Sequence, residues 1–163
     1  MAPIESYPAV ARILPGIPVR DVLNAKPEQL WTIEPDATVY RAIELMAVAE
    51  VSSLLVLDGE SLAGIMTERD YARKVILKGK SSRETRVDEI MTSKLVTVDQ
   101  QTTLQECMAL MTAHRVRHLP VLEAGRLVGL VSIGDVVRAT LIQQRHILEE
   151  MQRYVSGESR VGT

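Results

Sequence analysis

The stretch Gly64-Ile65-Met66-Thr67-Glu68-Arg69-Asp70 recurs in altered form as Gly129-Leu130-Val131-Ser132-Ile133-Gly134-Asp135, 65 residues further on. Both copies have a glycine, two aliphatic residues, a hydroxyl residue, two variable positions and an aspartate. The aliphatic residues predict the end of a buried strand, and a hydroxyl followed three residues later by a carboxylate predicts the start of a helix. The same strand-to-helix junction therefore occurs twice.

The similarity extends well beyond this motif. Residues 31–73 align without a gap with residues 96–138, and 12 of these 43 pairs are identical. Upstream, Val19–Leu23 resembles Val87–Met91 after a three-residue shift. A repeat of this kind indicates one small structural unit present in two copies. Each copy buries too little surface to be stable alone.

Each copy is predicted to fold as strand, helix, strand, strand, helix, because apolar residues at spacings of three and four indicate helices and short apolar runs around a Gly-containing turn indicate hairpins. In the first copy the predicted elements are a strand at 31–34, a helix through Val39, Ile43 and Met46, a hairpin of 54–57 and 62–66 around Asp58-Gly59, and a helix at about 68–78. In the second they are a strand at 96–99, a helix through Leu104, Met108 and Met111 capped by Thr103 and Glu106, a hairpin of 119–122 and 127–131 around Ala124-Gly125, and a helix from 133 to about 155.

The predicted fold class is therefore α/β (α+β), with two tandem β-α-β-β-α repeats packed about a pseudo-twofold axis. The expected organisation is an N-terminal extension at 1–18, repeat 1 at 19–79, a polar linker at 80–86, repeat 2 at 87–140, and a C-terminal helix and tail at 141–163.

Composition narrows the class of function. The net charge is -2 and only five of 163 residues are aromatic, which argues against nucleic acid as a partner. No apolar stretch approaches the ~20 residues of a membrane-spanning helix. The single cysteine, Cys107, lies on the apolar face of its predicted helix, so we expect a core residue in a reducing, cytoplasmic environment.

The repeated motif has two interpretations. A hydroxyl at the start of a helix lies beside free backbone N–H groups that favour a phosphate, and a carboxylate one turn later can accept hydrogen bonds from two ribose hydroxyls. Alternatively, Thr67 with Asp70 and Ser132 with Asp135 are plain capping boxes that only stabilise their helices. Retention of glycine, hydroxyl and aspartate in both copies favours binding.

The duplication and the two Gly-h-h-[ST]-x-x-Asp motifs together resemble a pair of CBS domains, named after cystathionine β-synthase, over roughly residues 19–140. The resemblance implies a non-catalytic regulatory module that binds an adenosine derivative (AMP, ADP, ATP, S-adenosylmethionine or NAD) between its copies and associates as a homodimer. It also implies that the aspartate holds the ribose and that the hydroxyl lies near the phosphate. No effector domain accompanies the pair, so the regulated protein would be a separate chain.

Carried onto this sequence, the resemblance assigns Thr67 and Asp70 to one nucleotide and Ser132 and Asp135 to a second. It assigns the basic residues Arg117 and His118 to the phosphate of the Thr67/Asp70 nucleotide. The matching segment of the first copy, Val51-Ser52-Ser53, carries no charge, so we expect the Ser132/Asp135 site to be the weaker for phosphate. The other positions assigned to nucleotide binding are Ile65, Val116, Val51, Ser53 and Arg69.

Other functions have less support in the sequence. An enzyme acting on a nucleotide would need a base beside the phosphate, and only His118 is available. A metal site at His114 and His118 has no third ligand at motif spacing. A structural or adaptor dimer with vestigial sites is the main alternative. The last helix carries an apolar stripe that either packs on its own module or forms a dimer or partner contact, namely Val137, Leu141, Leu148, Met151 and Val155.

Overall fold

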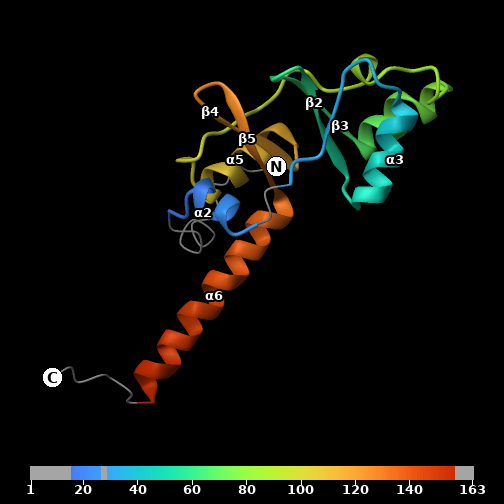
Figure 1. Ribbon diagram of the computed structural model, residues 1–163. Coiled ribbons are helices and arrows are strands. Elements are labelled where there is room, and N and C mark those ends of the chain that lie inside the picture. Colours follow the sequence, from blue (N-terminus) through green and yellow to red (C-terminus); the bar gives the residue numbers. More distant parts are fainter. Residues whose placement is uncertain (1–15, 27–28, 157–163) are drawn as a thin grey trace. The chain divides into compact units, whose positions relative to one another are not determined.

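The computed structural model describes residues 16–26 and 29–156 (Figure 1). The elements of repeat 1 are α2 (Val19–Asn24), β1 (Thr32–Ile33), α3 (Val39–Ala49), β2 (Ser53–Asp58), β3 (Ser61–Thr67), α4 (Glu68–Lys74) and the 3₁₀ turn η2 (Ile76–Lys78). Those of repeat 2 are the 3₁₀ turn η3 (Val87–Glu89), α5 (Leu104–His114), β4 (His118–Glu123), β5 (Arg126–Ser132) and α6 (Ile133–Val155). This mixed α/β architecture, with two β-α-β-β-α-like repeats, confirms the predicted fold class.

The described chain forms two compact units whose boundaries differ from those of the repeats. Unit 1 contains residues 16–26, 100–119 and 131–156, and unit 2 contains residues 29–99 and 120–130. Each unit therefore combines segments of both repeats.

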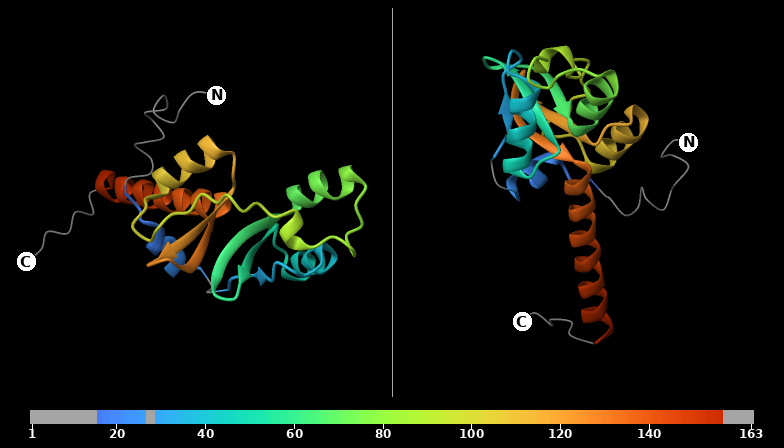
Figure 2. Two further views of the ribbon diagram at one scale, coloured as in Figure 1. Left: turned by 90° about the horizontal axis from the view of Figure 1, so that it is seen from above. Right: turned by 90° about the vertical axis from the view of Figure 1, so that its right-hand side faces the viewer.

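Unit 2 is built on a three-stranded sheet in the order β1-β2-β3. Strand β1 runs parallel to β2, and β2 pairs antiparallel with β3 from Ser53↔Thr67 to Asp58↔Ser61. The helices α3 and α4 cover the same side of the β2–β3 hairpin (Figure 2). The core between these elements is aliphatic, as expected for a chain without phenylalanine, and contains Ile33, Val39, Ala42, Met46, Leu54, Val56, Met66, Val75, Val87 and Ile90.

Two hairpins have the turns that their sequences predict. At the tip of the first, Gly59 has φ +61°, which glycine adopts without steric cost. In the second, β4 pairs with β5, and both Ala124 and Gly125 have positive φ, of 47° and 77°. Two consecutive positive φ values are the signature of a type I′ turn, whose twist matches that of a two-stranded hairpin.

Each repeat is preceded or begun by an opening segment, residues 17–26 for repeat 1 and 85–92 for repeat 2, which is hydrogen-bonded to the start of α5 or α3 in the opposite repeat. In unit 1, the N–H of Val19 donates to the carbonyl of Thr102 (2.8 Å) and that of Leu104 to the carbonyl of Ile17 (2.9 Å). In unit 2, the equivalent N–H groups of Val87 and Val39 donate to Ala37 and Thr85, both at 2.9 Å. The duplicated sequence therefore makes a duplicated set of hydrogen bonds, each between an opening segment and the opposite repeat.

The linker predicted at 80–86 is packed against α3. The side chain of Thr85 is buried, and the N–H of Tyr40 donates to the carbonyl of Ser82 (2.9 Å). The guanidinium of Arg83 lies over the ring of Tyr40, 3.8 Å from its centre, in a cation–π contact. This segment is consequently part of unit 2 and not a loose tether.

Two predicted elements differ from the structure. The strand expected at 96–99 is reduced to a single parallel bridge between Val98 and Val121. The second helix of repeat 1 was expected to continue to about Lys78, but α4 ends at Lys74 and a separate 3₁₀ turn, η2, follows. Val75 lies between α4 and η2, with φ −113° and ψ −68°, and its side chain is fully buried. The helix therefore breaks at the residue whose side chain enters the core. Gly79 then ends η2 with φ +65°, as its sequence position predicts.

The glycine of the first repeated motif has a packing role. Where the opening segment of repeat 2 crosses β3, Thr92 and Ile65 exchange two backbone hydrogen bonds of 2.9 and 3.0 Å. A Cβ atom at Gly64 would lie 2.7 Å from the sulfur of Met91 and 2.9 Å from the carbonyl oxygen of Thr92. Only glycine allows this close approach.

We expect Gly64→Ala to lower the free energy of unfolding by about 1–3 kcal/mol, the usual cost of overpacking. For a chain of this size that is a melting temperature lower by roughly 2–12 °C. The control is Gly134→Ala in α6, where an added Cβ meets only the Ser132 hydroxyl at 3.6 Å. Calorimetry of both variants checks this, and an unchanged melting temperature for Gly64→Ala would contradict the packing role.

Candidate functional site

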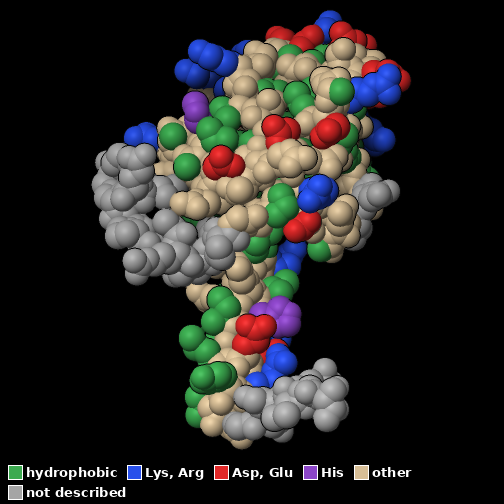
Figure 3. Space-filling model, turned by 90° about the vertical axis from the view of Figure 1, so that its left-hand side faces the viewer, with side chains coloured by type: hydrophobic (Ala, Val, Ile, Leu, Met, Phe, Trp, Pro, Cys, Tyr) green, Lys and Arg blue, Asp and Glu red, His purple; other side chains and the backbone are tan. Residues whose placement is uncertain are grey.

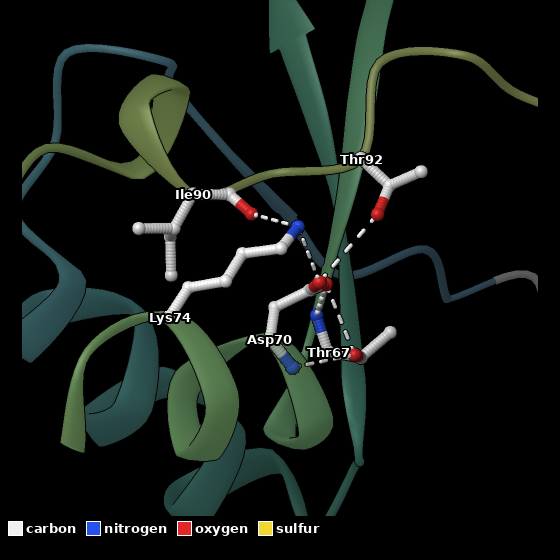
Figure 4. A network of polar contacts seen from close by, with 5 residues as sticks. All are labelled: Thr67, Asp70, Lys74, Ile90 and Thr92. Carbon is white, nitrogen blue, oxygen red and sulfur yellow. Dashed lines mark hydrogen bonds and ion pairs between the residues drawn. The ribbon is translucent and has the colours of Figure 1, made fainter. Parts of the chain in front are cut away.

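The carboxylate of Asp70 is the centre of a polar network in unit 2 (Figure 4). Its Oδ2 accepts hydrogen bonds from the backbone N–H and the hydroxyl of Thr67, both at 3.0 Å. Its Oδ1 pairs with the Lys74 ammonium at 2.8 Å and lies 3.5 Å from the Thr92 hydroxyl. The Asp70 N–H donates in return to the Thr67 hydroxyl (3.2 Å), which completes a capping box at the start of α4.

Lys74 links this carboxylate to the opening segment of repeat 2. Its ammonium also donates to the carbonyl of Ile90 at 2.7 Å, and its side chain remains 43% exposed. Since α4 places Lys74 one turn after Asp70, the i,i+4 spacing brings the two charges together.

Unit 1 has the corresponding capping box at the start of α6. The Ser132 N–H donates to Oδ2 of Asp135 at 2.8 Å, and the Asp135 N–H donates to the Ser132 hydroxyl at 3.2 Å. Position 139 is alanine, so α6 cannot supply a lysine one turn on as α4 does. Instead Lys26, just after α2, donates to Oδ2 of Asp135 at 2.7 Å. The Arg138 guanidinium lies 3.7 Å from the other oxygen.

Electrostatics keep Asp135 ionised. Burial opposes the charged form and by itself would raise the pKa of Asp135. The hydrogen bond and charge of Lys26, together with the N–H and hydroxyl of Ser132, outweigh burial, so the pKa is lowered overall. Unit 1 therefore presents a buried, ionised carboxylate at the first turn of a 23-residue helix.

The basic residues predicted to meet phosphate lie in unit 1. The carbonyl of Arg117 accepts from the N–H of Ile133 (2.9 Å), which places Arg117 and His118 beside the start of α6. Burial lowers the pKa of His118; the charge of Asp135 opposes this effect, and those of Lys26 and Arg117 add to it. Burial therefore favours the neutral imidazole. The predicted pairing of Arg117 and His118 with the Thr67/Asp70 site stays a prediction.

The remaining predicted positions fall into three groups. Ser53 and Ile65 are buried in the β2–β3 hairpin, where Ser53 pairs with Thr67. Val51 and Val116 occupy equivalent places just after α3 and α5, and their N–H groups donate to the carbonyls of Met46 and Met111. Arg69 is exposed.

Sequence reasoning missed the two lysines. The i,i+4 spacing of Asp70 and Lys74 was a usable signal once α4 was predicted. Lys26 and Asp135 are 109 residues apart, so no local pattern joins them. The hydroxyl of Thr92 was missed for the same reason.

Cys107 is fully buried, as predicted, and burial raises the pKa of its thiol to about 11. It is a core residue and not an activated nucleophile. Within residues 16–26 and 29–156 no group of three or more His, Cys, Asp or Glu side chains is arranged to hold a metal ion. No helix among these residues combines the length and apolar character needed to cross a membrane.

Comparison with known proteins agrees with the geometry. The CBS domain family model matches residues 19–76 and 87–142. The mitochondrial CBS domain-containing protein CBSX3 of Arabidopsis thaliana is 42% identical over 149 residues, which cover 85% of this chain and 72% of that protein. The CBS domain-containing protein YhcV of Bacillus subtilis is 32% identical and covers 72% of this chain and 81% of its own length.

Among solved structures, a signal-transduction protein with CBS domains from Burkholderia ambifaria is 51% identical, with a TM-score of 0.76. The match covers 78% of this chain and 96% of that one. The two matched segments, the repeated motif and the shared fold place this chain in the CBS-domain family, as a tandem CBS-domain pair of the regulatory and signal-transduction type.

Proposed function

We propose that this chain is an adenine-nucleotide sensor that changes conformation when ligand binds and so regulates a separate partner protein. One observation carries the proposal. Each unit has a hydroxyl and a buried carboxylate at the same helix start, and each carboxylate is balanced by a lysine that still reaches solvent.

The capping role is compatible with ligand binding at Asp70. Capping uses Oδ2, whereas Oδ1 is held by Lys74 and Thr92. A ribose that donates its hydroxyls to Oδ1 would take the place of Lys74 and of the longer Thr92 contact, and the capping bonds at Oδ2 would stay intact. The displaced ammonium then lies beside the ligand, where it favours a phosphate.

At Asp135 the competition is different. Its Oδ2 accepts from both the Ser132 N–H and the Lys26 ammonium, while Oδ1 lies 3.7 Å from the guanidinium of Arg138. The charges of Lys26 and Arg117 lower the pKa of His118, and the charge of Lys26 also lowers the pKa of Asp135. A phosphate bound here would favour protonation of His118.

The proposed working form is a homodimer that acts on an unidentified protein partner, without nucleic acid or membrane as partner. A ligand that changes the dimer or partner contact by a coupling of about 1–3 kcal/mol would suffice for regulation. We propose a cytoplasmic location from the single buried cysteine, although the name of the plant relative places that protein in mitochondria.

The alternative function is a structural or adaptor dimer with vestigial sites. It is favoured by one observation, that both carboxylates already satisfy a complete capping box and an ion pair without ligand. The two functions differ in whether nucleotide stabilises the protein.

We expect at least one of AMP, ADP, ATP, S-adenosylmethionine and NAD to raise the melting temperature. A ligand at 100 times its dissociation constant adds about 2.7 kcal/mol per site. For a chain of this length the shift is roughly 5–10 °C. If none of the five moves the melting point by a degree, the adaptor function is correct.

The ribose role is tested by Asp70→Ala and Asp135→Ala, each of which should abolish one site in a calorimetric titration. Both variants also lose a capping box, worth about 0.5–2 kcal/mol. Glu106→Ala is the matched control, because it removes the capping carboxylate at the start of α5, which is outside the proposed sites. Unchanged binding by the double aspartate variant would refute the proposal.

If a ribose displaces Lys74 from Asp70, the variant Lys74→Met should change the affinity for nucleoside. Adenosine, which has no phosphate to gain from the lysine, should bind the Asp70 site about two- to fivefold more tightly, because a part-exposed ion pair of up to ~1 kcal/mol no longer competes. Titration of adenosine into an Asp135→Ala background isolates this site. Arg73→Met, which removes a neighbouring exposed cation from α4, should leave the affinity unchanged. Weaker binding by Lys74→Met would contradict the competition.

The predicted inequality of the sites is tested through Arg117. If its guanidinium serves the Thr67/Asp70 site, Arg117→Ala should weaken AMP binding about tenfold in the Asp135→Ala background, because a charge-assisted bond is worth roughly 1.5–3 kcal/mol. Adenosine binding in the same background should not change. A loss of AMP affinity confined to the Asp70→Ala background would instead assign Arg117 to the Asp135 site that it adjoins in unit 1.

A further inference from the structure

Helix α6 continues past the end of the family match at residue 142 and extends beyond the rest of unit 1 (Figure 1). Along this part, hydrophobic side chains gather on one edge of the helix and charged ones on the other (Figure 3). The apolar edge is highly exposed, with Leu141 at 61%, Leu148 and Met151 at 60%, and Val155 at 86%. Monomeric proteins rarely leave so continuous an apolar strip in water.

The strip has the spacing of a helix–helix seam. Val137, Leu141, Gln144, Leu148, Met151 and Val155 follow one another at alternating intervals of four and three residues. This alternation keeps a narrow line of side chains facing one partner helix. Ile147 and Tyr154 widen the apolar face on one flank, whereas Arg138, Arg145 and Gln152 form the other flank.

We propose that residues 137–155 of α6 pair antiparallel with the same segment of a second copy of this chain. The proposal deepens the homodimer part of the proposed function by naming its contact surface.

The seam is self-complementary when one helix is reversed. With the twofold axis at residue 146, Val137 lies opposite Val155 of the second copy, Leu141 opposite Met151, and Gln144 opposite Leu148. Every position of the seam finds a partner, and no residue overhangs. The 19 paired residues span about 28 Å.

The flanks decide between the two orientations. In an antiparallel pair each flank faces its own equivalent, so Ile147 meets Ile147 and Tyr154 approaches Thr140. In a parallel pair the apolar flank faces the Arg145 and Gln152 flank, and Ile147 is set against polar groups. Burial of the apolar flank therefore favours the antiparallel arrangement.

The available area fits a second copy. The seam and its apolar flank expose seven large hydrophobic side chains per chain, at fractions of 42–86%: Val137, Leu141, Ile147, Leu148, Met151, Tyr154 and Val155. Side chains of these sizes together present on the order of 800 Å², about what each partner of a standard interface buries. Ile142, on the other side of the helix, stands apart from this face.

The first experiment compares Leu148→Glu with Ile142→Glu. The two residues have nearly equal exposure, 60% and 61%, on the same helix, but only Leu148 lies in the seam. Light scattering after size exclusion, without nucleotide, should show a dimer for the wild type and for Ile142→Glu, and a monomer for Leu148→Glu. Because no ligand is present, the result is independent of whether nucleotide binds.

A dimer that survives Leu148→Glu would overturn the proposal and place the contact elsewhere. A wild type that is monomeric at every concentration would also overturn it. In that case, a lower melting temperature for Leu148→Glu, but not for Ile142→Glu, would show that the seam packs against another part of its own chain.

Cross-linking tests the orientation. Under oxidising conditions Leu141→Cys and Met151→Cys should each stay uncross-linked alone and form a disulfide-linked dimer when mixed. The native Cys107 is buried and does not interfere. Cross-linking of either variant with itself would indicate a parallel pair and contradict the antiparallel seam.

Discussion

The exchange of opening segments between repeats is the constraint on which the rest of this structure depends. The first turns of α3 and α5 begin with N–H groups that no helix can satisfy internally. Thr85 and Ile17 supply the acceptors, and each belongs to the opening segment of the other repeat. The glycine of the repeated motif is part of the same constraint, because Gly64 leaves the space through which Met91 and Thr92 cross β3. Neither repeat completes its own backbone hydrogen bonding, so the stable folded unit is the pair of repeats.

The same crossing builds the candidate site. Thr92, which pairs with β3 through its backbone, also brings its hydroxyl to the Asp70 carboxylate, and Ile90 brings a carbonyl to Lys74. In unit 1 the opening segment of repeat 1 supplies Lys26 to Asp135. Each aspartate thus has a role in its own helix cap and a contact with the opening segment of the opposite repeat. A ligand that binds either carboxylate competes with the contacts that hold this segment, which is how binding energy can become a change of structure.

Local patterns in the sequence predicted most elements but not their partners. Alternating apolar residues and Gly-containing turns located both hairpins, and helical spacing located α3, α5 and the full length of α6. The expected strand at 96–99 is only a single parallel bridge between Val98 and Val121, and α4 ends early, at Lys74. A local pattern carries no information on which neighbours compete for a backbone group. The motif Gly-h-h-[ST]-x-x-Asp predicted the hydroxyl–carboxylate pairs, whereas the lysine opposite Asp135 comes from 109 residues away and has no local signature.

The two carboxylates differ in what lies beyond them, and this difference bears on how a sensor of this design gives an output. Asp70 opens a helix of seven residues that ends at Lys74, within unit 2. Asp135 opens α6, whose 23 residues span about 34 Å and carry the exposed seam. A small change in tilt at the first turn of α6 becomes a displacement of several ångströms at Val155, because a helix moves as a rigid body. Under the proposed function, exchange of Lys26 for a ligand therefore acts directly on the surface that joins two copies, whereas exchange at Asp70 acts only within its own unit. The two sites would then differ in their consequences as well as in their chemistry, and the Asp135 site is the one placed to control association.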